Sequence, residues 1–327
     1  MMNFDGPLFI IGMPRSGTKL IRNILRRHPR IRISGAETEF FPWLVRVVAR
    51  SGDLSRRERF ARFYDDIVQL PHFVYKRSNG TLIPCERWFD ACRTFDAEDI
   101  FESLVREEVG AYRGSGLIWG DKSPSYISEI PLLHRSFSSA RFIHIVRDVR
   151  DYTLSMQYAW GKDILRSAQR WTDSVRRARQ DGLDVRPNYT EIRYEDLLRN
   201  PEGELRKICE FLEIDFVVEI IDLDRPSEST GDARGQSRLV RENYGKYLAK
   251  MDRDLLKRVE AVAGRVLVEC GYDLFFVPQK EQRVTRIEMM AAQIRDAWSR
   301  LLLERKKRGL VPGFRFVWSY FRMTKHK

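Results

Sequence analysis

The sequence of 327 residues is 43% hydrophobic and 12% aromatic, which is enough apolar material for a sizeable core and excludes a fully disordered chain. Its 58 lysines and arginines outnumber 46 acidic residues, and the net charge of +12 predicts an anionic partner or ligand. The four cysteines are scattered and form no cluster with the five histidines, so neither a disulfide scaffold nor a metal site is expected. Hydropathy predicts no signal peptide and no membrane-spanning helix, and we therefore expect a cytoplasmic protein.

Short apolar runs alternate with stretches of helical periodicity along most of the chain. Strands are expected at Leu8–Ile11, Ile31–Ile33, Leu117–Gly120, Arg141–Val146 and Tyr189–Tyr194. Helices are expected at Thr18–Arg27, Phe41–Arg50, Arg56–Leu70, Ala97–Tyr112, Asp148–Trp160, Leu165–Gln180, Pro201–Glu213 and Asp252–Glu269. This alternation predicts an α/β fold with a mostly parallel sheet flanked by helices.

A change in composition after Pro278 divides the chain into an expected α/β domain, residues 1–278, and a basic extension, residues 279–327. Residues 280–327 hold thirteen Lys or Arg and four acidic residues, and so carry +9 of the net charge. The extension contains an amphipathic stretch, followed by a basic cluster at residues 305–308 and an aromatic run at residues 314–321. The apolar residues at helical spacing in the amphipathic stretch are Ile287, Met290, Ile294, Trp298 and Leu301.

This extension is suited to two kinds of contact. It can pack on the rest of the chain or on a second subunit of a homo-oligomer, or it can make peripheral contact with an anionic membrane or lipid. Because the sequence holds no recognised nucleic-acid-binding motif, no nucleic acid partner is expected.

The first expected strand leads through a glycine-containing turn, GMPRSG at residues 12–17, into an expected helix. Amides at such a turn point outward and the helix dipole favours negative charge, so the segment predicts a phosphate-binding loop. The two glycines have the spacing of the Walker pattern, but Thr18 stands where that pattern has lysine. Lys19 follows one residue late, and Leu20 stands after it, where a magnesium-binding hydroxyl would be needed.

The segment FIIGMPRSGTKL resembles the 5′-phosphosulfate loop of sulfotransferases that use 3′-phosphoadenosine 5′-phosphosulfate (PAPS). Its Arg-Ser-Gly-Thr form is similar to that of the bacterial, tyrosylprotein and polysaccharide branches of this family. The resemblance implies that Arg15 contacts the sulfuryl group and the 5′-phosphate, together with Ser16, Gly17 and Thr18. Lys19 stands where the family usually has Thr or Ser, so it either replaces a hydroxyl contact with a charged one or points to solvent.

The segment RFIHIVRDVRDYTLSM resembles the strand and helix with which this family binds the 3′-phosphate, which implies that role for Arg147 and Ser155. An arginine at a strand end presents two parallel N–H donors to a phosphate. Lys246, in a segment similar to the family's Lys-Trp pair, is implied to help hold the same phosphate, and Tyr194 matches a position that touches the nucleotide. Arg150 has no counterpart role and is expected to be a solvated helix residue.

Two further segments resemble the catalytic parts of the family. SGAETEFFPW places Glu37 at the position of the catalytic base, with Glu39 two residues away as the alternative, and WGDKSPSYI places Lys122 near the leaving oxygen. The resemblance covers about residues 7–275 and implies a P-loop type of nucleotide-binding fold. It also implies metal-independent in-line transfer of a sulfuryl group from PAPS to an acceptor hydroxyl, with Glu37 as base and with Arg15 and Lys122 stabilising charge.

The sequence leaves the acceptor open among carbohydrate, lipid, small molecule and tyrosine. It also leaves two other function classes open. An ATP-dependent P-loop kinase would share the fold and the basic loop, although the Walker pattern is displaced by one residue. A non-catalytic anion- or membrane-binding module would act through the basic, aromatic extension.

Overall fold

The computed structural model describes residues 4–221, 223, 226, 234–278 and 280–308, so the expected aromatic run at residues 314–321 lies outside it. The chain forms two compact units, which are described separately. Unit 1 comprises Met1–Val146, Arg177–Ser227 and Gly235–Leu239. Unit 2 comprises Arg147–Arg176, Glu228–Arg234 and Val240–Lys327. The expected domain boundary at residue 278 stays a prediction.

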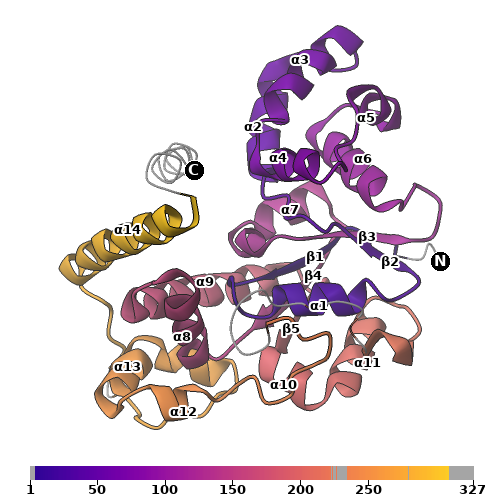
Figure 1. Ribbon diagram of the computed structural model, residues 1–327. Coiled ribbons are helices and arrows are strands. Elements are labelled where there is room, and N and C mark those ends of the chain that lie inside the picture. Colours follow the sequence, from indigo (N-terminus) through magenta and orange to yellow (C-terminus); the bar gives the residue numbers. More distant parts are fainter. Residues whose placement is uncertain (1–3, 222, 224–225, 227–233, 279, 309–327) are drawn as a thin grey trace. The chain divides into compact units, whose positions relative to one another are not determined.

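Unit 1 is built on a five-stranded sheet in the order β2-β3-β1-β4-β5 (Figure 1). All four strand pairings are parallel, which confirms the predicted class of sheet. The strands are β1 (Leu8–Gly12), β2 (Ile31–Ile33), β3 (Ile118–Lys122), β4 (Arg141–Val146) and β5 (Tyr189–Arg193). After β1 the chain moves to the β2–β3 side of the sheet, and after β4 it moves to β5. This reversal beside β1 is the place where parallel α/β sheets bind ligands, at the carboxyl ends of the strands.

Helices cover both faces of this sheet, with α2–α7 on one side and α1, α10 and α11 on the other (Figure 1). Two short 3₁₀ turns, η1 (Pro124–Ser128) and η2 (Val218–Ile221), complete unit 1. The helices are α1 (Thr18–Leu25), α2 (Phe41–Ser51), α3 (Arg57–Ile67), α4 (Pro71–Ser78), α5 (Cys85–Ala91), α6 (Ala97–Val109), α7 (Ile130–Ser136), α10 (Tyr194–Arg199) and α11 (Pro201–Phe211). The sequence did not predict α4, α5, α7 or α10, each of which is at most eight residues long and too short for a clear periodic pattern.

Aromatic side chains fill the core on the α2–α7 side of the sheet. Phe9 of β1 stacks on its β4 neighbour Phe142 with ring centres 5.6 Å apart and meets Tyr126 edge-on. Phe41 and Phe101 bring α2 and α6 together with ring centres 4.9 Å apart. Burial of such large rings is the main stabilising term for these helices, and the edge-on contacts add about 0.5–1.5 kcal/mol each.

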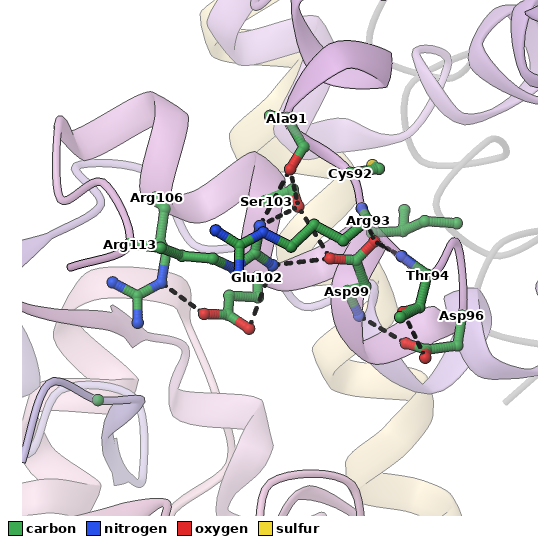
Figure 2. Close-up of polar contacts among 12 residues, drawn as sticks. Ala91, Cys92, Arg93, Thr94, Asp96, Asp99, Glu102, Ser103, Arg106 and Arg113 are labelled. Carbon is green, nitrogen blue, oxygen red and sulfur yellow. Dashed lines mark hydrogen bonds and ion pairs between the residues drawn. The ribbon is translucent and has the colours of Figure 1, made fainter. Parts of the chain in front are cut away.

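A polar network fixes the connection from α5 to α6 (Figure 2). One carboxylate oxygen of Asp99 accepts hydrogen bonds from the amides of Arg93, Thr94 and Phe95, at 2.6, 2.9 and 3.0 Å. The other oxygen pairs with Arg113 at 2.7 Å. Burial raises the pKa of Asp99, but these amides and Arg113 outweigh it, so the net shift is downward and Asp99 holds the loop as an anion.

Unit 2 is helical. It contains α8 (Val149–Trp160), the first part of α9 (Ile164–Asp184), α12 (Tyr247–Lys250), α13 (Arg253–Glu269) and α14 (Arg286–Arg308). None of the helices in the described part of the chain combines the length and the hydropathy needed to cross a membrane.

The prediction that Arg150 is a solvated helix residue is wrong. Its side chain is buried in unit 2, where it pairs with Asp148 at 2.7 Å and with Glu260 of α13 at 2.6 Å. Its guanidinium also lies 4.2 Å from the ring centre of Tyr247. Two carboxylates and an aromatic face offset the cost of burying this charge, so Arg150 joins α8 to α12 and α13.

Candidate active site

The segment after β1 is a tight turn that requires glycine at two positions. A Cβ atom on Gly12 would lie 2.5 Å from the carbonyl oxygen of Ile145, and one on Gly17 would lie 2.4 Å from the ring of Tyr194. Both glycines have positive φ angles, 152° and 95°, and so does Arg15, at 72°. Such a conformation costs a non-glycine residue on the order of 1–3 kcal/mol, and strain of this kind is typical of functional loops.

The same turn gathers groups that are able to donate hydrogen bonds to an anion. Ser16 is fully buried, and its Oγ has no hydrogen-bond partner among the described residues. Gly17 precedes α1 without a side-chain cap, and the first turn of α1 holds no acidic residue. Arg15 and Lys19 are both half-buried in this segment. A buried hydroxyl, a helix N-terminus and two cations fit the phosphosulfate group that the sequence resemblance implies.

Glu37 and Lys122 form an ion pair in unit 1. The Lys122 side chain, at the end of β3, is almost fully buried, whereas that of Glu37 is 43% exposed. Burial lowers the pKa of Lys122; the Glu37 carboxylate opposes this shift and the Arg22 guanidinium adds to it. An accessible carboxylate beside a desolvated ammonium group can accept a proton while the ammonium neutralises developing negative charge.

The two candidate glutamates have different surroundings. Lys122 is joined to Glu37, and the sequence alone had left Glu39 as the alternative. Glu39 has a φ of 52°, and its backbone amide donates to the Oγ of Ser123 at 3.3 Å. The main chain at Glu39 therefore fixes the turn, and the side chain of Glu37 is the one that meets the lysine.

Buried side chains hold the segment that carries Glu37. Arg22 of α1 donates to the carbonyl oxygen of Gly35 at 2.7 Å, which ties the segment to the helix that follows the turn at residues 12–17. The Tyr126 hydroxyl lies 2.8 Å from Thr38 Oγ1 and accepts from the amide of Phe41 at 3.1 Å. The position of Glu37 is thus fixed from both ends of its segment.

A buried network of His72, Glu108 and Lys76 also reaches this segment. His72 Nδ1 lies 3.2 Å from the carbonyl oxygen of Glu37, and its Nε2 lies 2.7 Å from Glu108 Oε1. The ring of His72 therefore bridges the main chain at Glu37 and the carboxylate of Glu108. Lys76 and Ser34 contact the other oxygen of Glu108, at 2.8 and 3.1 Å. Burial raises the pKa of Glu108, but His72 and Lys76 outweigh it and lower the pKa overall.

The residues expected to hold the 3′-phosphate lie in unit 2. Arg147 directly follows β4; its Nη2 donates to the carbonyl oxygen of Asn243 at 3.3 Å, and its own carbonyl accepts from Trp171 at 3.0 Å. Lys246 Nζ donates to the side-chain oxygen of the same Asn243. Ser155 is half-buried in α8. The structure thus places Arg147 and Lys246 around one asparagine.

The main chain around Lys246 is fixed by Asp151 of α8. This carboxylate accepts from the amides of Gly245 and Tyr247, at 2.6 and 3.0 Å. Burial raises the pKa of Asp151, and the Arg147 guanidinium and these two amides oppose the shift.

The structure brings together Glu37 with Lys122 and Gly17 with Tyr194 in unit 1, and Arg147 with Lys246 in unit 2. Sequence reasoning missed Arg22, His72, Glu108 and Tyr126, which position the Glu37 segment. Tyr126 lies inside the segment WGDKSPSYI, which the sequence had linked to the catalytic parts of the family. The others meet through the fold and share no sequence pattern.

Comparison with known proteins gives a consistent result. The model of the family described as "Sulfotransferase family" matches residues 7–217. "Protein-tyrosine sulfotransferase 1" of Danio rerio is 23% identical over 295 residues, covering 83% of this chain and 74% of the relative. A "Putative protein-tyrosine sulfotransferase" of Caenorhabditis briggsae is 25% identical over 223 residues, covering 66% and 68%. The solved "Sulfotransferase Domain from the Curacin Biosynthetic Pathway" has a TM-score of 0.50 and 21% identity, covering 83% of this chain and 99% of that domain, and supports the fold.

Proposed function

Because the chain belongs to the sulfotransferase family, we propose that it transfers a sulfuryl group from PAPS to an acceptor hydroxyl. The observation that carries this proposal is the ion pair of the accessible Glu37 with the buried Lys122. It lies in the same compact unit as the phosphate-binding loop, and Arg22 ties its segment to the helix that begins in that loop.

In the proposed reaction PAPS supplies the sulfuryl group and leaves as the 3′,5′-bisphosphate. Glu37 takes the proton from the acceptor hydroxyl, an effect typically worth about 10²–10⁴-fold in rate. Lys122 holds positive charge where the leaving oxygen becomes negative, and Arg15 neutralises charge on the sulfuryl oxygens. Ser16, Gly17, Thr18 and Lys19 bind the 5′ end of the donor through hydroxyl, amide and ammonium groups.

In unit 2, Arg147, Ser155 and Lys246 are proposed to bind the 3′-phosphate, and Tyr194 of unit 1 to contact the nucleotide. Two cations beside Asn243 support this assignment, because charge-assisted hydrogen bonds are the strongest way to hold a phosphate. Binding this part of the donor aligns it without taking part in the chemical step.

Among the acceptors that the sequence left open, we propose a tyrosine hydroxyl as the first to test. Two relatives are named as protein-tyrosine sulfotransferases, and each resembles more than half of this chain. Carbohydrate, lipid and small-molecule hydroxyls are the comparison acceptors.

Two rival functions are less well supported. For an ATP-dependent kinase, the position that should offer a magnesium-binding hydroxyl is Leu20, whose side chain is buried. For a non-catalytic binding module, the paired Glu37 and Lys122 would have no evident use. A cytoplasmic location, a homo-oligomer and peripheral contact of residues 280–327 with an anionic membrane stay predictions.

The test is transfer of a label to an acceptor. The full chain is incubated with EDTA, sulfur-35-labelled PAPS and a tyrosine peptide, an oligosaccharide, a hydroxylated lipid or a simple phenol. A parallel reaction without EDTA contains γ-phosphate-labelled ATP and magnesium in place of PAPS. Label from PAPS on any acceptor supports the proposal, and label on the tyrosine peptide supports the acceptor assignment. Transfer from ATP, with none from PAPS, would contradict the proposal and favour the kinase.

A further inference from the structure

Helix α14 of unit 2 presents a row of large apolar side chains to solvent. Ile287, Met290, Ile294, Trp298 and Leu302 are each 56–81% exposed. Their spacing of three or four residues places them on one face of the helix. The sequence had predicted an amphipathic segment here, and packing of its apolar face on the rest of the chain was one of the expected arrangements. Within unit 2 that arrangement is not found.

The opposite face of α14 is the one that packs. Asp296 is 3% exposed; it accepts from the amide of Asp163 at 2.8 Å and pairs with Arg166. At about 100° per residue, Asp296 lies half a turn away from Ile287. Ala292, on the same side as Asp296, is also buried. The helix is therefore held by its polar side.

Further contacts fix this orientation. Arg295 pairs with Asp163 at 2.7 Å, and Glu288 pairs with Arg258 of α13 at 3.1 Å. A Cβ atom on Gly161, at the end of α8, would lie 2.9 Å from that of Ser299, so the backbones approach closely. Rotating the apolar row inward would break the Asp296 and Arg295 ion pairs and leave Asp296 without compensation.

A row of this kind normally marks a surface that something apolar covers. Residues 280–327 carry +9 of the chain's net charge of +12, and the basic cluster at 305–308 ends this helix. If two copies of the chain met through their apolar rows, their two basic extensions would lie close together, and the repulsion between them would oppose self-association. An anionic bilayer attracts the basic residues and accepts the apolar row, and tryptophan is enriched at membrane interfaces.

We infer that the Ile287–Leu302 row of α14 is a membrane-contact surface that docks this protein on anionic phospholipid. The helix lies along the bilayer surface, with the five apolar side chains inserted at the level of the headgroups and with the exposed Arg286 beside the lipid phosphates. This inference does not depend on the proposed reaction, because it rests on residues that take no part in it.

The test is co-sedimentation of the full chain with vesicles of phosphatidylcholine alone or with about 30% phosphatidylglycerol. The wild type should bind the anionic vesicles, and added salt should weaken this binding. The double variant Ile294→Gln/Trp298→Gln should reduce the bound-to-free ratio about tenfold or more, because two inserted apolar side chains are lost. A matched control, Leu248→Gln/Val268→Gln, replaces apolar residues that are equally exposed in unit 2 but outside α14, and should bind as the wild type does.

The outcomes separate the occupants of this face. If the wild type fails to bind anionic vesicles, or if the Ile294/Trp298 variant binds as well as the control, the inference is wrong. Sedimentation velocity supplies the third arm: a wild-type dimer that the same variant converts to a monomer, without vesicle binding, would assign the row to a second copy of this chain and overturn the inference. Equal thermal unfolding midpoints for both variants verify that only the surface has changed.

Discussion

The segment that carries the proposed base, Glu37, and the segment that carries Lys246, assigned to the 3′-phosphate, are held in different ways. In unit 1 the carbonyl oxygen of Glu37 contacts His72, and His72 contacts Glu108, so buried side chains fix the main chain at Glu37. In unit 2 the Asp151 carboxylate accepts hydrogen bonds from the amides of Gly245 and Tyr247, so the segment around Lys246 is held through its main chain. Activity should therefore be sensitive to substitutions at residues such as Glu108, which are assigned no contact with the donor. In the segment that carries Lys246, removing a cation should leave the main chain in place.

The largest effect is expected for Glu37→Gln, which keeps the size of the side chain and removes the base. Label transfer from PAPS should fall about 10²–10⁴-fold. Affinity for the product bisphosphate should change little, because that contact is assigned elsewhere. The control is Glu39→Gln in the same segment, which should retain nearly full activity. Loss of activity in the Glu39 variant alone would reassign the base.

Glu108→Gln tests the side-chain support of the reacting end. It leaves His72 and Lys76 buried without their shared anion, and breaking a buried ion pair in this way costs about 3–5 kcal/mol of unfolding free energy. Because the pKa of Glu108 is lowered in the folded state, its contribution to stability should be present at neutral pH and lost as the pH falls through the folded-state pKa. Urea denaturation of wild type and variant from about pH 7 to about pH 3 measures both effects. A variant as stable as the wild type at neutral pH would contradict the network.

Asp121→Asn should stabilise the protein. Burial raises the pKa of Asp121 from 3.8 to about 6, so between these two pH values the folded state keeps a proton that the unfolded state releases. The free energy of unfolding therefore falls as the pH rises through about 6. An asparagine side chain stays neutral, so the variant avoids the cost of burying this charge, which is up to about 3 kcal/mol. Denaturation at about pH 8 should show this gain, and at about pH 4 the gain should nearly vanish. An equal gain at both values would mean that the charge of Asp121 is not its source.

Arg147→Ala should weaken binding of the bisphosphate without moving its neighbours. Loss of charge-assisted hydrogen bonds costs about 1.5–3 kcal/mol, which is roughly a tenfold to hundredfold increase in Kd. Arg170→Ala removes an exposed arginine of the same unit and serves as the control. Equal affinity in the two variants would remove Arg147 from the phosphate site.

The strands were predictable to within two residues at each end because each is encoded by a continuous segment; the third strand, expected to end at Gly120, runs on to Lys122. Residues 8–20 contain strand, turn and helix start in one stretch, and Lys122 lies where the third strand stops. The predicted end of the fifth strand was one residue too late, because Tyr194 begins α10 and β5 ends at Arg193. Glu195 and Asp196, in the first turn of α10, favour a helix start there.

The contacts that position Glu37 could not be predicted, because they join distant parts of the chain. His72 and Glu108 lie on two different helices and share no motif, and α4, which carries His72, was itself missed. Arg150 was misjudged because a charged residue near a helix start is usually solvated, whereas here α13 supplies a buried partner. For α14 the amphipathic pattern was correct, but the pattern alone does not determine which face packs.

The most direct test of the central claim is calorimetric titration of the full chain with 3′-phosphoadenosine 5′-phosphate and, separately, with ATP, both without magnesium. It requires no knowledge of the acceptor. We expect binding of the bisphosphate in the micromolar range and much weaker binding of ATP, which lacks the 3′-phosphate. No binding of the bisphosphate, or a preference for ATP once magnesium is added, would contradict the assignment of PAPS as the donor.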